Sequence, residues 1–122
     1  MINETKKILD KSVDVTATCV RVPVLVSHAE SINIEYDKDY TLEKVIYLLE
    51  NADGCKVVND QKDSGYITQL EAAGKDETFI SRIRKDNTNE KAINLWIVSD
   101  NLLRGAALNA VEIAEAYIRT KQ

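Results

Sequence analysis

The alternation of apolar and polar residues constrains the fold of this chain more than any other feature. Valine, isoleucine and aromatic residues gather in short runs, and several of these runs alternate with polar residues as half-buried strands do. They predict five strands, over residues 13–26, 31–36, 55–58, 79–84 and 92–98. Pro23 has no backbone donor, so the first strand is expected to lie at a sheet edge or to contain a bulge.

Three other segments carry apolar residues at helical spacing. The predicted helices cover residues 2–10, 42–50 and 102–119. Thr41 is placed to cap the second helix, and either Asp100 or Asn101 is placed to cap the third. Residues 59–78 are polar and rich in turn formers, so we expect a long surface loop there. This order predicts an α+β fold, with a mixed or antiparallel sheet and helices on one face.

The composition fits one soluble domain and excludes several classes of partner. The 122 residues can bury a core, and the net charge of -4 gives no basic surface for nucleic acid. No apolar run is long enough for a membrane span, and the polar N-terminal residues do not form the apolar part of a secretory signal. The two cysteines, Cys19 and Cys55, are widely spaced, which argues against a disulfide framework or a zinc site and suits a reducing cytoplasm. No metal site is expected.

The glycines also limit what the chain can bind. There are four, and no two have the spacing of GxGxxG or GxxxxGK. The backbone cradle that holds the phosphate of a dinucleotide or nucleotide is therefore not expected in this chain.

Two polar residues stand out in the apolar stretch CVRVPVLVSH, residues 19–28. Arg21 is either an edge-strand residue whose head reaches water or a clamp for a carboxylate or phosphate, and the pattern favours neither. His28, the only histidine, is either a solvent-facing loop residue, which the pattern alone favours, or a general acid/base. Ser27 precedes it without a GxSxG motif, so a hydrolytic triad is not supported.

The remaining candidates have a structural interpretation beside a functional one. Cys19 and Cys55 lie in apolar runs, where a thiol is usually unreactive, so a structural role is favoured. The tripeptide Gly105-Ala106-Ala107 follows Asn101 at the start of the last predicted helix. Such small residues serve either tight helix packing or the close approach of a flat ligand or another backbone.

Three separated strings carry a resemblance to a known family. TATCVRVPVLVSHAESINIEY, AAGKDETFISRIRKDN and INLWIVSDNLLRGAALNAVEIAE resemble, in order, the C-terminal part of bacterial aspartate-semialdehyde dehydrogenases, and the resemblance covers nearly the whole chain. It implies a substrate-binding and homodimerisation domain over residues 1–100 and, over residues 101–122, a helix that belongs to an NADP-binding Rossmann domain. The family reduces aspartyl phosphate to aspartate semialdehyde with NADPH, a step toward lysine, methionine, threonine and diaminopimelate, so the resemblance implies a cytoplasmic oxidoreductase.

The resemblance also assigns roles to individual residues. Arg21 matches the arginine that binds the carboxylate of the substrate, and His28 matches the acid/base histidine. Asn101 matches a polar residue on the nicotinamide side of NADP, and Gly105 belongs to the same wall. Cys19 matches a family cysteine that is not the nucleophile.

The resemblance implies that several parts of the enzyme lie outside this sequence. The nucleophilic cysteine, the Rossmann glycines and an EExK substrate-binding motif are expected upstream of Met1. We therefore expect the chain to be inactive alone, whether it is a truncated product, an excised domain or a subunit that needs a separate N-terminal half. Gln69 and Ser81 stand where the family often has proline and glycine, which puts the conformation of that region in question. The alternative is a non-catalytic homodimerisation module. The strings CVRVP and DNLLRGAALN argue against relatives that act on N-acetylglutamyl phosphate or phosphoglycerate.

Overall fold

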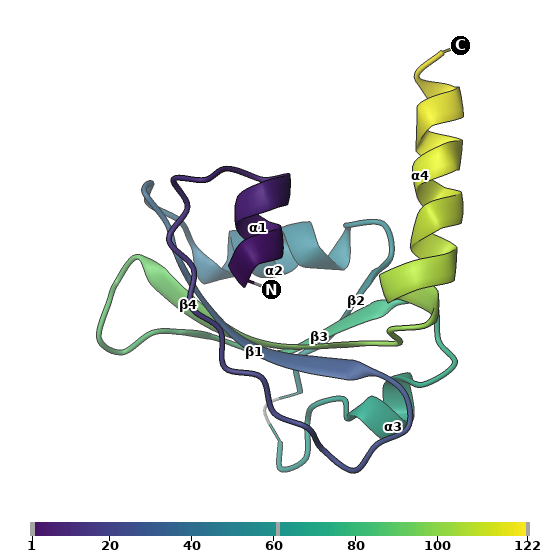
Figure 1. Cartoon of the computed structure of the whole chain (residues 1–122). Coiled ribbons are helices and arrows are strands. Elements are labelled where there is room, and N and C mark those ends of the chain that lie inside the picture. Colours follow the sequence, from purple (N-terminus) through teal and green to yellow (C-terminus); the bar gives the residue numbers. More distant parts are fainter. Residues whose placement is uncertain (1, 61, 122) are drawn as a thin grey trace.

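A four-stranded mixed sheet forms the centre of the molecule (Figure 1). The computed structural model describes residues 2–60 and 62–121. Across the sheet the order is β1 (His28–Glu35), β4 (Ala92–Ser99), β3 (Thr78–Lys85) and β2 (Cys55–Val58). β4 runs antiparallel to both β1 and β3, and β2 runs parallel to β3. The predicted α+β class with a mixed sheet is confirmed, as are four of the five predicted strands, with small shifts of their ends.

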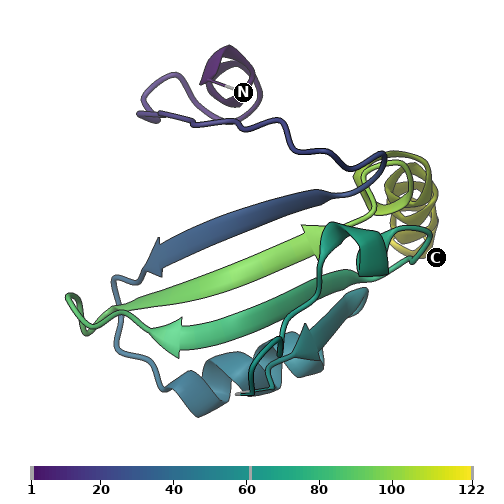
Figure 2. The ribbon, with the colours of Figure 1, turned by 90° about the horizontal axis from the view of Figure 1, so that it is seen from below.

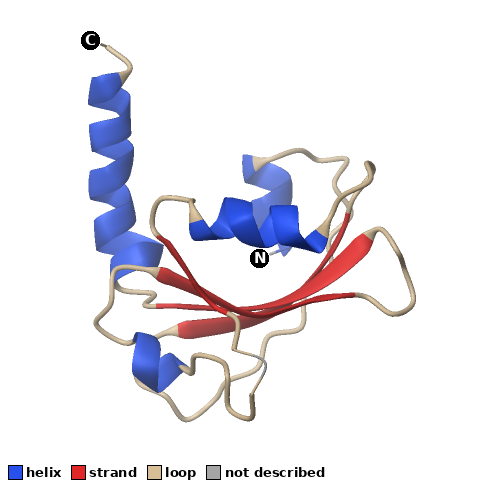
Figure 3. Ribbon diagram, turned by 180° about the vertical axis from the view of Figure 1, so that it is seen from behind, coloured by secondary structure: helices blue, strands red, loops and turns tan. Residues whose placement is uncertain are grey.

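Helix α2 (Leu42–Glu50) covers one face of the sheet, and the short helix α3 (Gln69–Ala72) lies against the other (Figure 3). Each face has its own core. Under α2, Ile83 and Ile93 are fully buried with Ile80 and Leu95. The opposite face buries Phe79, Val98 and Ala72, the last from α3 itself.

Helix α2 forms where the sequence predicts it. The Thr41 hydroxyl accepts a hydrogen bond from the Lys44 N–H at 3.2 Å, so the expected N-cap is present. The helix ends at Asn51, whose N–H bonds back into the last turn. Gly54 follows with φ at 73°, a left-handed conformation that glycine adopts without strain and that turns the chain into β2.

The predicted strand over residues 13–26 is wrong, and we call this segment the strap. It passes outside β1 as an irregular chain after α1 (Ile2–Ile8), as Figure 2 shows. A strand needs a hydrogen-bonded partner, whereas here the Val24 N–H bonds to the carbonyl of Val22, two residues back, in a turn that breaks the extended run. The strap therefore leaves Leu25 fully exposed and Val20 76% exposed.

The region predicted as a long loop contains one helix that the prediction missed. Thr68 and Glu71 form a capping box around the start of α3, because the backbone N–H and the hydroxyl of Thr68 both donate to the Glu71 carboxylate at 2.8 Å. The same region is tied to the sheet by Trp96, whose indole N–H donates to the carbonyl of Ile67 at 2.9 Å. The polar stretch is thus anchored at two points.

The last helix begins differently from the prediction. Its first turn, η1 (Leu103–Ala107), is a π-helix, and α4 (Leu108–Arg119) continues it. The wider turn is visible in the hydrogen bonds from the N–H groups of Gly105 and Ala107, each to the carbonyl five residues earlier. α4 then stands away from the body of the molecule and contributes no buried residue (Figure 1).

Candidate functional site

The end of β4 and the start of β1 bring three of the four candidate residues to one end of the sheet. Because the two strands are antiparallel, His28 at the start of β1 pairs with Ser99 at the end of β4. Asn101 follows two residues later, and its side-chain oxygen accepts the backbone N–H of Ser27 at 2.7 Å. His28 therefore opens a strand, where the sequence analysis placed it in a loop between two strands. Its side chain is exposed.

A buried carboxylate organises the chain next to this end. Asp100 is 3% exposed and accepts hydrogen bonds from the N–H groups of Gly74 and Leu102, each at 2.7 Å, and of Leu103 at 3.1 Å. These bonds, led by the one from Gly74, lower the pKa of Asp100. The N-cap residue of η1 is Leu102, and the Asp100 side chain supports this helix start by binding the N–H groups of Leu102 and Leu103 while it also fixes the loop after α3. This leaves Asn101, the other predicted cap, free to bond Ser27.

Gly105 lies beside Asn101 on the surface. A Cβ built on Gly105 would meet only the Asn101 Cβ, at 3.7 Å, which is an ordinary contact. The described packing therefore does not require a glycine here. The exposed position leaves room for another group to approach the backbone.

Arg21 lies apart from these residues, on the strap. It is exposed, and within the described parts of the chain its guanidinium has no hydrogen-bond or ion-pair partner. The structure thus places Arg21 on an irregular segment and His28 on a strand, seven residues further along the chain. Its charge is available to an anion, and no described contact fixes its direction.

The two clearest hollows in the described structure lie elsewhere. One is lined by Leu42, Asn94 and the residues around Asp86, at the far end of the sheet, and the other lies between α1 and the strap near Cys19. Neither hollow is lined by Arg21, His28, Asn101 or Gly105. Of the two cysteines, Cys55 packs into the core under α2, whereas Cys19 is exposed, so its predicted place in a buried strand is wrong.

Among residues 2–60 and 62–121, no cluster of three His, Cys, Asp or Glu side chains could hold a metal ion. In the same part of the chain, no helix has the length and apolarity needed to cross a membrane.

Ser27 enters the sequence analysis only as a candidate hydrolytic nucleophile, and neither its conformation nor its burial was predicted. Its φ of 81° lies in the left-handed region, which is uncommon for a side chain other than glycine. It is 5% exposed, and its hydroxyl has no hydrogen-bond partner in the described structure. In the sequence, only its position next to His28 drew attention to Ser27. A serine does not favour a left-handed backbone, so its conformation could not be predicted.

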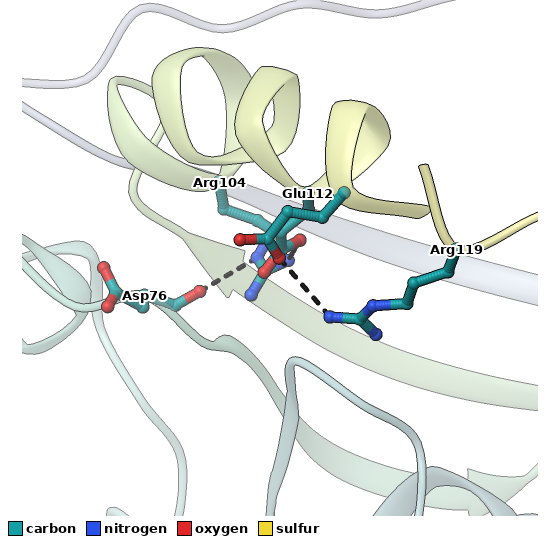
Figure 4. Close-up of polar contacts among 5 residues, drawn as sticks. Asp76, Arg104, Glu112 and Arg119 are labelled. Atoms are coloured by element: carbon teal, nitrogen blue, oxygen red, sulfur yellow. Dashed lines mark hydrogen bonds and ion pairs between the residues drawn. The ribbon is translucent and has the colours of Figure 1, made fainter. Parts of the chain in front are cut away.

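Arg104 attaches the C-terminal helix to the sheet (Figure 4). Its Nε–H donates to the carbonyl of Asp76 at 2.9 Å, and its guanidinium forms an ion pair with Glu112 of α4. Gly54 makes room for it, since a Cβ there would lie 2.6 Å from the Arg104 Nη2. Further along α4, Arg119 pairs more loosely with Glu115 at 3.5 Å. Arg104 thus links three parts of the chain at the root of α4.

Comparison with known proteins gives a consistent result. The family described as "Semialdehyde dehydrogenase, dimerisation domain" matches residues 1–104. The chain is 47% identical over 119 residues to an aspartate-semialdehyde dehydrogenase of Prochlorococcus marinus, a match that covers 97% of this chain and 35% of the relative. It is also 47% identical to the enzyme of that name from Bacillus subtilis, over 95% of this chain and 34% of the relative.

Solved structures agree with the sequence relatives. A crystal structure of aspartate semialdehyde dehydrogenase II from Vibrio cholerae, complexed with ASA, matches with a TM-score of 0.82 and 42% identity. The match covers 98% of this chain and 35% of that one, so the chain spans about a third of the length of the proteins it resembles. Its sheet, its helices and nearly its whole sequence lie within the match to these enzymes. The chain therefore belongs to the family of semialdehyde dehydrogenase dimerisation domains.

Proposed function

We propose that this chain is the C-terminal, substrate-binding and dimerisation part of an aspartate-semialdehyde dehydrogenase. Such an enzyme reduces L-aspartyl 4-phosphate to L-aspartate 4-semialdehyde and phosphate with NADPH. The observation that carries the proposal is the match over 98% of the chain to the Vibrio cholerae enzyme complexed with ASA. The description of the family as a dimerisation domain supports a second copy of the same chain as the partner.

Arg21 and His28 are the residues that we propose act on the substrate. The exposed Arg21 guanidinium, which has no partner in the described chain, can bind the substrate carboxylate through two parallel hydrogen bonds. The exposed His28 imidazole, at the start of a strand, can accept and return a proton near neutral pH. The thiol that would attack the acyl phosphate is proposed to lie in a part of the enzyme outside this sequence.

Asn101 and Gly105 are proposed to line the nicotinamide side of NADP, which supplies a hydride when bound. The exposed Gly105, which no described packing requires, fits a flat ring placed against the backbone. No glycine-rich phosphate cradle occurs in the sequence, so the phosphates would be held elsewhere. We therefore propose that the chain alone is inactive and that the whole enzyme is cytoplasmic.

The domain boundary is part of the same proposal. Residues 1–100 would form the substrate-binding and dimerisation domain, and residues 101–122 would pack on the NADP-binding domain. The projection of α4 supports this, because its apolar side chains Val111, Ile113, Tyr117 and Ile118 are each more than half exposed. The family match also ends at residue 104, close to the root of α4.

A chimaera tests the proposal. This chain would replace the corresponding third of the Bacillus subtilis relative, and NADPH-dependent reduction of aspartyl phosphate would be measured. We expect activity in the chimaera and none in the chain alone. Arg21→Gln should raise KM for the substrate by about 10- to 100-fold, because a charged hydrogen-bonded contact is lost. His28→Asn should lower kcat by about 100-fold or more, because proton transfer is lost.

The matched control is Arg82→Gln, which removes an exposed arginine on β3 and should leave both constants unchanged. A soluble chimaera in which the Arg21 and His28 variants behave like this control would contradict the proposed roles. That outcome would favour the alternative, a module that dimerises without taking part in catalysis.

A further inference from the structure

The backbone next to His28 is held by a side chain. The pairing between β1 and β4 ends at His28 and Ser99. One residue earlier, Ser27 has a φ of 81° and lies outside the ladder. The side-chain oxygen of Asn101 accepts the N–H of Ser27 at 2.7 Å in a partly buried setting. A side-chain amide thus extends the ladder by one bond beyond its last backbone pair.

Asn101 is itself rigidly placed. Its neighbour Asp100 is buried and is bonded by three backbone N–H groups, two from the start of the last helix and one from Gly74. The Asp100 carbonyl accepts a further bond from Gly105. An acceptor fixed at its base in this way can restrain the more mobile partner, and here the partner is the end of the irregular strap.

The restraint matters because Ser27 separates the strap from the strand. On one side, the strap has exposed apolar residues and no strand pairing. On the other, His28 begins the ladder. Without the Asn101 acceptor the half-buried N–H of Ser27 would be unpaired, and the left-handed conformation at Ser27 would be free to relax toward an extended one. The Cα and imidazole of His28 would move with it.

We infer that Asn101 is a positioning residue for His28, acting through the backbone of Ser27. The chemical role of His28 rests on the function proposed above, whereas the restraint rests on the geometry alone. One consequence concerns the cofactor. Since one acceptor site of the Asn101 Oδ1 is used by Ser27, the Nδ2 group is left to donate to a ligand such as a nicotinamide carboxamide.

The single histidine makes the test direct, because every imidazole resonance in the spectrum belongs to His28. Three forms of the chain would be compared by NMR: wild type, Asn101→Asp and Asn101→Leu. Aspartate keeps an acceptor oxygen at this position, and leucine has a similar volume with no acceptor. In the leucine variant we expect the Ser27 amide to exchange with solvent about tenfold faster or more, and the His28 ring signals to shift and broaden. The aspartate variant should keep both near wild type, apart from a uniform shift due to its charge.

Three outcomes would overturn the inference. One is a folded leucine variant with unchanged Ser27 exchange and unchanged His28 signals. Another is an aspartate variant that behaves like the leucine variant. The third applies even if the leucine variant does not fold, because it is measured on the wild type: the Ser27 amide exchanges as fast as the exposed amides of the strap. The proposed function fails separately, through a chimaera in which His28→Asn keeps full activity while the NMR signature of Asn101 is as expected.

Discussion

Replacing Ser27 by glycine should stabilise the protein. Serine at φ 81° holds a left-handed backbone at a cost of about 1 kcal/mol or more, which glycine avoids. The substitution also removes a buried hydroxyl without a partner, for which the penalty is about 1–3 kcal/mol. Against these gains, glycine adds freedom to the unfolded chain worth about 0.5–1 kcal/mol and loses the packing of one carbon. The balance favours Ser27→Gly by about 1 kcal/mol.

The assay is urea unfolding followed by the fluorescence of Trp96, the only tryptophan. A gain of about 1 kcal/mol raises the midpoint by about 0.5 M at the slopes usual for this chain length. Ser27→Ala separates the two terms, because it removes the hydroxyl and keeps the strained Cβ: it should gain the hydroxyl penalty of about 1–3 kcal/mol alone, and its difference from glycine measures the strain against the added freedom of the unfolded chain. Arg82→Gly is the control for strain alone, at an exposed bulge residue with φ 55°. A glycine variant at position 27 that is less stable than wild type would refute the reasoning.

Three further substitutions probe other contacts. Asp100→Asn should make the free energy of unfolding depend less on pH between pH 7 and pH 3. The pKa of Asp100 is lowered in the folded state, so its carboxylate stabilises the fold fully above the unfolded pKa of about 4, and this stabilisation is lost as the pH falls below that value. Urea unfolding midpoints across this pH range would measure the effect. Equal slopes for variant and wild type would contradict this. Trp96→Phe should cost about 1 kcal/mol, because the partly buried carbonyl of Ile67 loses its donor, and hydrogen exchange should rise around residue 67. Unchanged exchange there would argue that the bond does not hold the loop. Gly54→Ala should cost about 1 kcal/mol or more, since φ is 73° and the new Cβ displaces the Arg104 guanidinium. Amide hydrogen exchange at the start of α4 should become faster. A loss of stability without faster exchange in α4 would mean that backbone strain at position 54 is the whole effect and that Arg104 does not hold the helix.

The elements that the sequence predicts well carry their determinants locally. Helix α2 has a capping threonine, an apolar stripe and a C-cap at Asn51, all within a short span. Strands β3 and β4 have apolar residues on both faces, and the structure buries both faces. In each case the residues that stabilise the element are the residues that form it, so one sequence suffices.

The failures concern properties that depend on distant partners. The strap has strand composition, but it does not pair with β1, which remains the edge strand of the sheet. The choice between Asp100 and Asn101 as helix cap depended on Gly74, which reaches Asp100 from the loop after α3. The helix at Gln69–Ala72 is a different case, because its capping box was present in the sequence but lay within a stretch judged by its polarity.

For the candidate site, the residues were predicted from the sequence, and the structure shows which of them lie on regular secondary structure. His28, Asn101 and Gly105 belong to the sheet end and the start of η1, whereas Arg21 belongs to the strap. Periodicity could not make this distinction, since it placed Arg21 inside a strand and His28 in the loop after it, the reverse of what the structure shows. Their relative position is therefore a property of the strap and not of the sheet.

The strap cannot be ordered by its own side chains. Fixing the backbone of each residue costs about 1–2 kcal/mol, while burying a valine or leucine returns about 1.5–3 kcal/mol, and the strap already leaves Val20 and Leu25 in water. Its ordering therefore requires a surface that covers these two residues, and in the proposed enzyme the second subunit or the NADP-binding domain would supply it. His28 needs no such help, because its ladder partner Ser99 and the Asn101 bond to Ser27 are internal. It follows that assembly would complete the proposed site by fixing Arg21, the proposed carboxylate-binding residue, against a histidine that is already in place.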